Sequence, residues 1–224
     1  MHTMIRILSI IFLVSYTASY SQNWQLIWED DFNGNSLDQT KWVHDIGTGS
    51  QYGMWGWGNG ELQYYQSQNT TIYNGVATIT VNEEPAGLVD SWGNTSYYSS
   101  SKITTKGIFD FRYGKVEARI KSLDGEGFWP AFWLMPLEDI RWPQGGEIDI
   151  LENRGRITNI SSSALHFGKK WGDKSTLVGE VLIPSYANFQ DTFHSITFRW
   201  EQDKLSFFLA VSYTHLTLPT ILLV

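Results

Sequence analysis

Short runs of alternating apolar and polar residues recur along most of this 224-residue chain. Clear examples are Val76–Val81, Val116–Lys121 and Ile196–Trp200, and Asn74-Gly75 is a turn signal before the first of them. Alternation with a period of two, broken by Gly and Asn, is typical of antiparallel strands. No long segment combines a helical period with caps at both ends. The pattern therefore predicts an all-β sandwich or barrel in a single domain.

The N-terminal segment differs from this pattern. Residues 1–21 combine a short basic start, an apolar run at Ile7–Val14 and small residues before Gln22. These features predict a secretory signal peptide, and the alternative is a buried N-terminal strand. We therefore expect a secreted or periplasmic protein without membrane attachment after cleavage, whose domain begins at Gln22.

The C-terminal segment differs as well. Residues 211–224 follow a predicted strand at Leu205–Ala210, and residues 211–220 match an in-frame translation of a transposase-type sequencing adapter. The alternative is a genuine terminal strand. We expect a domain at residues 22–210 that lacks its last strands, followed by a non-native tail. Unpaired strand edges favour aggregation, so we expect low solubility and little activity from this chain.

Composition and charge narrow the classes of function. The chain has no Cys, and 23 Asp and Glu against 16 Lys and Arg give a net charge of -7. The absence of Cys excludes disulfides, thiol nucleophiles and thiolate metal sites. The acidic balance argues against nucleic acid as a partner, because binding to phosphates requires a basic surface. Carboxylates and a few His remain for chemistry.

Tryptophan is abundant, and several Trp residues lie beside Gly, Asn or Pro, in expected loops or at strand ends. At such positions a large ring is less often part of the hydrophobic core alone. Any one ring fits a core position as well as an exposed one. As a set, the rings indicate a groove lined with flat apolar faces, which suits the C–H faces of sugars. The seven that lie near turn residues are Trp42, Trp55, Trp57, Trp129, Trp133, Trp142 and Trp171.

Three carboxylates lie within six residues, at Glu147, Asp149 and Glu152, among branched apolar side chains. On a strand, Glu147 and Asp149 face the same side, whereas Glu152 would face the other. A β-bulge near Ile150-Leu151 would return Glu152 to their face, and bulges are frequent beside active sites. The spacing therefore predicts three acids on one face, with the bulge between the second and the third.

Three clustered carboxylates repel one another, which raises the pKa of one of them. A protonated acid beside an ionised one is what glycoside hydrolysis requires, because one group protonates the leaving oxygen while another stabilises or attacks the anomeric carbon. The alternatives are a solvated acidic edge strand and a calcium site. Calcium loops are usually rich in Gly, Asn and Asp, unlike this segment.

The segment resembles the signature of glycoside hydrolase family 16, in its laminarinase-like (endo-β-1,3-glucanase) branch. The resemblance covers residues 24–210 and implies a β-jelly-roll (concanavalin A-like) sandwich of two antiparallel sheets, with an aromatic-lined cleft and a retaining double displacement. Further blocks similar to the family occur in the same order, at residues 28–34, 56–65, 97–106, 113–121, 127–134 and 164–167.

The resemblance also implies roles for single residues. Glu147 matches the nucleophile, Asp149 the carboxylate that tunes it, and Glu152 the general acid and base. Lys102 stands where many relatives have Arg, and Lys cannot make a planar bidentate contact. A lone His such as His166 is more often structural than catalytic. The substrate-binding candidates at matched positions are Asn59, Glu61, Lys102, Trp129, Trp133, Trp142 and His166.

The resemblance implies no cofactor for the reaction. Asp31 matches a position that many members use for a structural calcium ion, and the Asp that completes that site lies on a last strand that this chain lacks. We therefore expect calcium only in a full-length protein. No metal is expected in the site itself.

The leading hypothesis is a secreted endo-acting β-1,3-glucanase, a monomer whose partner is a laminarin-type or mixed-linkage β-glucan. One alternative is a galactanase of the same family, similar to agarases or carrageenases, because relatives change substrate through their loops. The other is a non-catalytic glucan-binding sandwich. The three intact acids argue against the last, since a binding module has no need for a repelling triad.

Overall fold

A computed structural model of the chain describes residues 24–183, 188–211 and 221–223. The predicted signal peptide and most of the predicted tail lie outside these residues. The described part contains no α-helix and three 3-10 turns, η1 (Ser50–Tyr52), η2 (Trp55–Gly58) and η3 (Ser67–Asn69). None of its helices is long and apolar enough to cross a membrane.

The described residues contain fifteen strands, and this content confirms the predicted all-β class. The first seven are β1 (Val43–Asp45), β2 (Gln63–Tyr65), β3 (Thr70–Tyr73), β4 (Val76–Ile79), β5 (Asn82–Val89), β6 (Thr95–Ser100) and β7 (Lys102–Thr104). The others are β8 (Gly114–Ile120), β9 (Ala131–Leu134), β10 (Glu147–Arg154), β11 (Ile157–Lys170), β12 (Asp173–Leu182), β13 (His194–Glu201), β14 (Lys204–Val211) and β15 (Ile221–Leu223).

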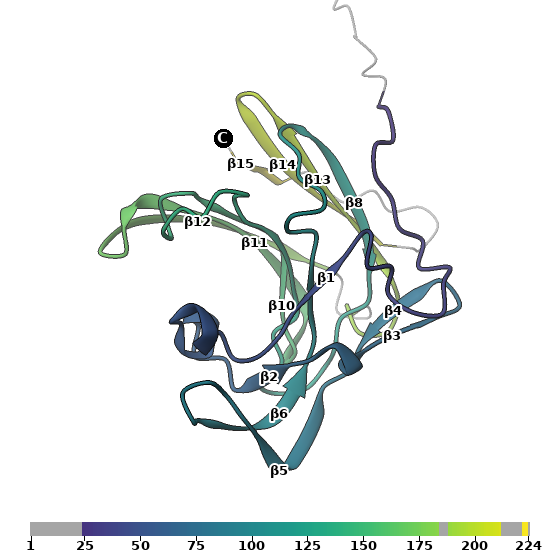
Figure 1. Cartoon of the computed structure of the whole chain (residues 1–224). Helices are drawn as coiled ribbons and strands as arrows, with labels where there is room; N and C mark the ends of the chain where they lie inside the picture. The colour runs from purple at the N-terminus through teal and green to yellow at the C-terminus, as the bar shows by residue number, and fades with distance from the viewer. Residues whose placement is uncertain (1–23, 184–187, 212–220, 224) are drawn as a thin grey trace, which may run out of the picture.

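Two four-stranded antiparallel sheets form the sandwich (Figure 1). One has the order β12-β11-β10-β9 and the other β15-β14-β13-β8. Alternation along each strand sends apolar side chains to one face, so the two inner faces bury them against each other. The core consists of Ile150, Leu151, Ile183, Phe189, Ile196, Phe198, Phe207 and Leu209.

The remaining strands pair in smaller groups, β2-β6-β5, β1-β7 and β3-β4. Within these smaller groups β2 and β6 run parallel, whereas the other strand pairs of the described residues are antiparallel. The thirty residues or so that separate these two strands provide the crossover length that parallel pairing needs. The turn predicted at Asn74-Gly75 joins β3 to β4, with positive φ at both residues, 49° and 73°.

The predicted strand at Leu205–Ala210 lies within β14, which pairs with β13 along its whole length. Of the predicted tail, Val211 ends β14, and Ile221–Leu223 form β15 beside it. Residues 212–220 and 224 lie outside the described part of the chain.

We expect Phe198→Ala to lower the free energy of unfolding by about 3–5 kcal/mol, because it empties a fully buried ring position in the core. Urea unfolding followed by tryptophan fluorescence measures the change. The matched control is Phe167→Ala on β11, whose side chain is 45% exposed and should cost much less. Equal losses in the two variants would contradict this location of the core.

Candidate active site

A bulge in β10 sets the geometry of the acidic cluster. Asp149 pairs with Ala164 of β11 and Glu152 with Ser162, so three steps on β10 match two on its neighbour. The register with β9 shifts at the same place. Ile150 and Leu151 consequently both enter the core. The predicted bulge is confirmed, and it returns Glu152 to the face of Glu147 and Asp149.

Asp149, the middle acid, is 5% exposed. Burial, together with the charges of Glu147 and Glu152 and a hydrogen bond with Glu147, raises its pKa to about 8. Like-charge repulsion and desolvation both favour the neutral form. Asp149 therefore holds a proton at neutral pH and can donate it in a hydrogen bond to Glu147. The sequence predicted one raised pKa in the cluster, and the structure assigns it to the middle acid.

His166 lies against this acid, as its matched position implied. Its Nε2 is 3.2 Å from Asp149 Oδ2, and its Nδ1 is 3.0 Å from Thr176 Oγ1 on β12. Since a neutral imidazole has one donor and one acceptor nitrogen, a proton on Nε2 lets Thr176 donate to Nδ1. Thr176 was not identified from the sequence. The Thr176 hydroxyl holds the His166 ring through Nδ1, the nitrogen that does not contact Asp149.

Each outer acid accepts a hydrogen bond from an indole N–H. Trp142 donates to Glu147 Oε2 at 2.5 Å, and Trp129 donates to Glu152 Oε1 at 2.8 Å. A cation lies over each ring: the Arg154 guanidinium is 3.8 Å from the Trp129 centroid, and Lys174 Nζ is 5.0 Å from that of Trp142. These rings therefore orient the acids as well as line the site.

Trp133 and Lys102 join the acid face to the loop around η2. Trp133 is the cross-strand partner of Asp149 on β9. Lys102 Nζ lies 5.0 Å from the Trp133 ring, 4.0 Å from the Trp57 ring and 3.3 Å from Asp45 Oδ2. The ammonium group is thus shared between two rings and one carboxylate. Lys102 thus brings the Trp57 and Trp133 rings together beside Asp149.

Asn59 and Glu61 form a separate polar group beyond Trp57. Asn59 Nδ2 is 3.4 Å from Glu61 Oε1, and Glu61 Oε2 accepts from Gln63 at 2.8 Å and from the Tyr65 hydroxyl at 2.6 Å. Burial, followed by the charge of Glu61, raises the pKa of Tyr65 far above its usual range. Tyr65 also packs 5.8 Å from Trp57. Gln63 and Tyr65 were not identified from the sequence.

Two predicted positions lie elsewhere. Trp42 packs edge-on against Trp28 at 5.2 Å and donates its N–H to Asp30, so it belongs to a different aromatic cluster. Its flanking turn residues did not reveal which way the ring points. Asp31 is exposed, and the described residues contain no group of three potential metal-ligating side chains.

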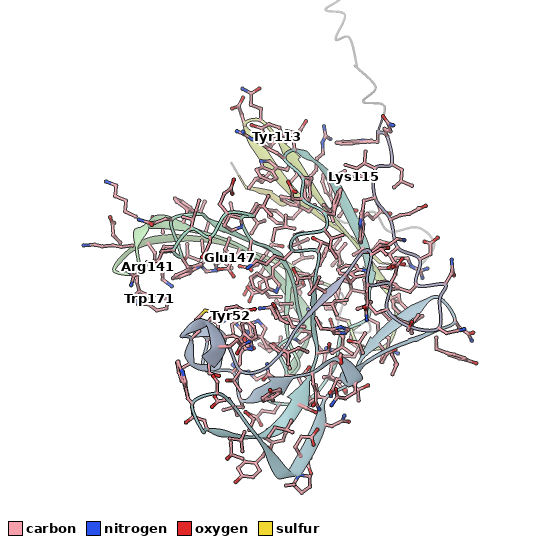
Figure 2. All side chains as sticks on the ribbon, in the orientation of Figure 1. Tyr52, Tyr113, Lys115, Arg141, Glu147 and Trp171 are labelled. Atoms are coloured by element: carbon pink, nitrogen blue, oxygen red, sulfur yellow. The ribbon has the colours of Figure 1, made fainter. Side chains whose placement is uncertain are left out.

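The site therefore combines two outer glutamates, Glu147 and Glu152, with the buried, protonated Asp149 between them and flanking aromatic rings. Such an arrangement can supply a nucleophile or base and a proton donor on the same face. Figure 2 shows Glu147 near the middle of the molecule, with Trp171 and Arg141 further out beneath the β11–β12 arm and Tyr52 on the turns below.

Comparison with known proteins identifies relatives of this chain. Residues 54–215 match the sequence model of glycosyl hydrolases family 16. Glucan endo-1,3-beta-glucosidase A1 of Niallia circulans is 34% identical over 82% of this chain and 28% of its own length. Glucan endo-1,3-beta-glucosidase of Cryptopygus antarcticus is also 34% identical, over 88% of this chain and 70% of its own. This chain therefore spans little more than a quarter of the first relative.

The fold has a solved counterpart. The catalytic domain of an endo-1,3-beta-glucanase (laminarinase) from Thermotoga petrophila superposes with a TM-score of 0.77 at 33% identity. The match covers 88% of this chain and 78% of that one. The jelly-roll class expected from the resemblance is confirmed.

We expect Asp149→Asn to stabilise the folded protein increasingly as the pH rises from about 4 to about 8. An Asp side chain in the unfolded state has a pKa near 3.9, whereas the folded pKa is about 8. Between these values the unfolded chain releases a proton that the folded protein keeps, so the wild type loses stability and the Asn variant does not. Thermal melts across this pH range test the prediction.

The control for this series is Asp124→Asn, at an exposed position. Its difference from wild type should stay nearly constant with pH. A constant difference for Asp149→Asn as well would contradict the raised pKa.

Proposed function

The chain belongs to glycosyl hydrolases family 16, and on that basis we propose that the protein is an endo-acting β-1,3-glucanase that hydrolyses laminarin-type glucan by a retaining double displacement. The observation that carries the proposal is the bulged strand β10, which presents Glu147, Asp149 and Glu152 on one face. Retaining glycosidases need two carboxyl groups close together beside the scissile bond.

In the first step, Glu147 attacks the anomeric carbon while Glu152 donates its proton to the leaving glycosidic oxygen. The C–O bond to the leaving sugar breaks and an ester to Glu147 forms. In the second step, Glu152 takes a proton from water, the water oxygen attacks the same carbon, and the ester to Glu147 breaks. Glu152 is then protonated again and Glu147 is again a carboxylate.

Asp149 supports both steps without reacting. Its proton is held by burial and by the two neighbouring acids, and a hydrogen bond from Asp149 to Glu147 partly offsets the charge on the nucleophile. The Trp142 and Trp129 N–H groups hold the outer acids in place. Positioned donors of this kind cost no reorganisation during the reaction.

The substrate assignment rests on aromatic faces and on the relatives. Trp57 and Trp133 flank Lys102 beside the acids, and flat rings suit the C–H faces of glucose units. The relatives described above are named for 1,3-β-glucan cleavage. We also propose a monomer that acts outside the cytoplasm, as the N-terminal sequence suggests, and that accepts mixed-linkage glucan as a secondary substrate.

We expect the full-length protein to release reducing sugars from laminarin and, more slowly, from lichenan, but not from agarose or κ-carrageenan. Glu147→Gln should lower the rate by roughly three orders of magnitude or more, because it removes the nucleophile. The exposed Glu117→Gln on β8 is the matched control and should keep full activity. Release only from the galactans would favour the galactanase alternative, and binding without release would favour a glucan-binding module.

We expect the first product of laminarin hydrolysis to carry its new reducing end in the β configuration. Two successive displacements at the anomeric carbon restore the configuration of the substrate. Proton NMR within the first minutes, before mutarotation, distinguishes the anomers. An initial excess of the α anomer would indicate a single displacement and would exclude Glu147 as a covalent nucleophile.

A further inference from the structure

Four basic residues gather at one end of the acid face, and we propose that they bind an anionic substituent, a sulfate or a carboxylate, on the glycan chain that occupies the site. We call Arg141, Lys169, Lys170 and Lys174 the basic tip. The inference rests on the proposed function and specifies the substrate class further: a β-glucan that carries negative groups.

The basic tip is built from two segments that hold each other. Gln144 Nε2, in the loop before β10, donates to the Lys169 carbonyl at 2.7 Å. The rings of Trp142 and Trp171 pack at 4.9 Å. In the view of Figure 2, the labels of Arg141 and Trp171 both lie toward the outer end of the β11–β12 arm. The loop and the hairpin tip therefore form one surface, although they are distant in the sequence.

A second bulge shapes this surface. The β11–β12 register shifts between Gly168 and Lys170. Gly168 has φ +149°, and a Cβ there would lie 2.2 Å from the Asp173 carbonyl oxygen. Only Gly fits such an approach, so the close packing of the backbone at this point depends on it. The bulge brings the backbone of Lys169 within hydrogen-bonding distance of Gln144 in the loop that carries Arg141.

The charge of the basic tip contrasts with that of the whole protein. The chain has a net charge of -7, yet no ion pair joins any of these four cations to a carboxylate within the described residues. Asp173, Glu138 and Asp139 lie on the same two segments, so the cations are in local excess by one. Exposed lysines are usually only solvated. Here, Lys174 Nζ also lies 5.0 Å and 5.2 Å from the Trp142 and Trp171 rings.

The basic tip is connected directly to the reacting acid. Trp142 donates to Glu147 and packs against Trp171, whose side chain is 66% exposed. In the proposed complex, the sugar next to the one at Glu147 stacks on these two rings, where Lys174 is the cation in contact with both. Rings that stack on the sugar face and cations that meet its substituents are together suited to an anionic glycan.

The test compares neutral laminarin with carboxymethylated and sulfated β-1,3-glucan, using the full-length protein. For the double variant Lys169→Gln/Lys170→Gln we expect KM on the anionic glucans to rise about tenfold, because each exposed charge contributes roughly threefold. We expect kcat to stay unchanged, and kcat/KM on laminarin to stay within twofold. Added salt should raise the wild-type KM for the anionic glucans only, through screening.

The control is Lys115→Gln/Lys121→Gln, which removes the same charge from the exposed positions at and next to β8. The proposal would be overturned if the two double variants raised KM for the anionic glucans equally. It would also be overturned if the wild-type KM for these glucans did not change with salt concentration. Affinity electrophoresis of the Glu147→Gln protein in gels with each glucan separates this question from hydrolysis. The same gels compare the Glu147→Gln protein with and without Lys169→Gln/Lys170→Gln. Equal retardation of the two proteins by the anionic glucans would also overturn the proposal.

Discussion

One extra residue in β10 determines how the rest of the site is arranged. Without the bulge, a strand with a period of two would send Glu152 into the core and Leu151 toward solvent. With it, both Ile150 and Leu151 reach the core, and the three acids share a face. Asn153 follows directly and is wholly buried, where it accepts from Ser122 and donates to the Ile160 carbonyl. These hydrogen bonds hold Asn153 opposite Ser161, after which the register shifts again at Arg154.

The cost of gathering three acids is reduced by two means. A proton stays on Asp149, so the cluster carries less negative charge than its composition suggests. The outer acids receive N–H donors from Trp129 and Trp142, and each of those rings has a cation over its face. Among the described residues, the Lys and Arg side chains nearest to Glu147 and Glu152 thus lie over the Trp rings that donate to these acids.

Much of this arrangement follows from sequence spacing, because strand geometry is periodic. The separation of Glu147, Asp149 and Glu152 was enough to predict the bulge, and Asn74-Gly75 was enough to predict its hairpin. Contacts between distant segments were not predictable in this way. The Trp129 ring lies 23 residues from its acceptor Glu152, and its orientation depends on packing. The direction of the Trp42 ring was not predictable for the same reason, since turn residues beside a ring do not reveal where it points. The parallel pairing of β2 with β6 likewise depends on a crossover that local pattern does not encode.

Trp142 takes part in two sets of contacts at once. Its N–H meets Glu147, while its ring faces touch His166, Trp171 and Lys174. A change at the hairpin end that shifts this ring therefore also moves the donor on the acid. Evolution of the outer loops toward a different polysaccharide would then alter turnover along with selectivity, and a second, compensating substitution near β10 would be needed to separate the two properties.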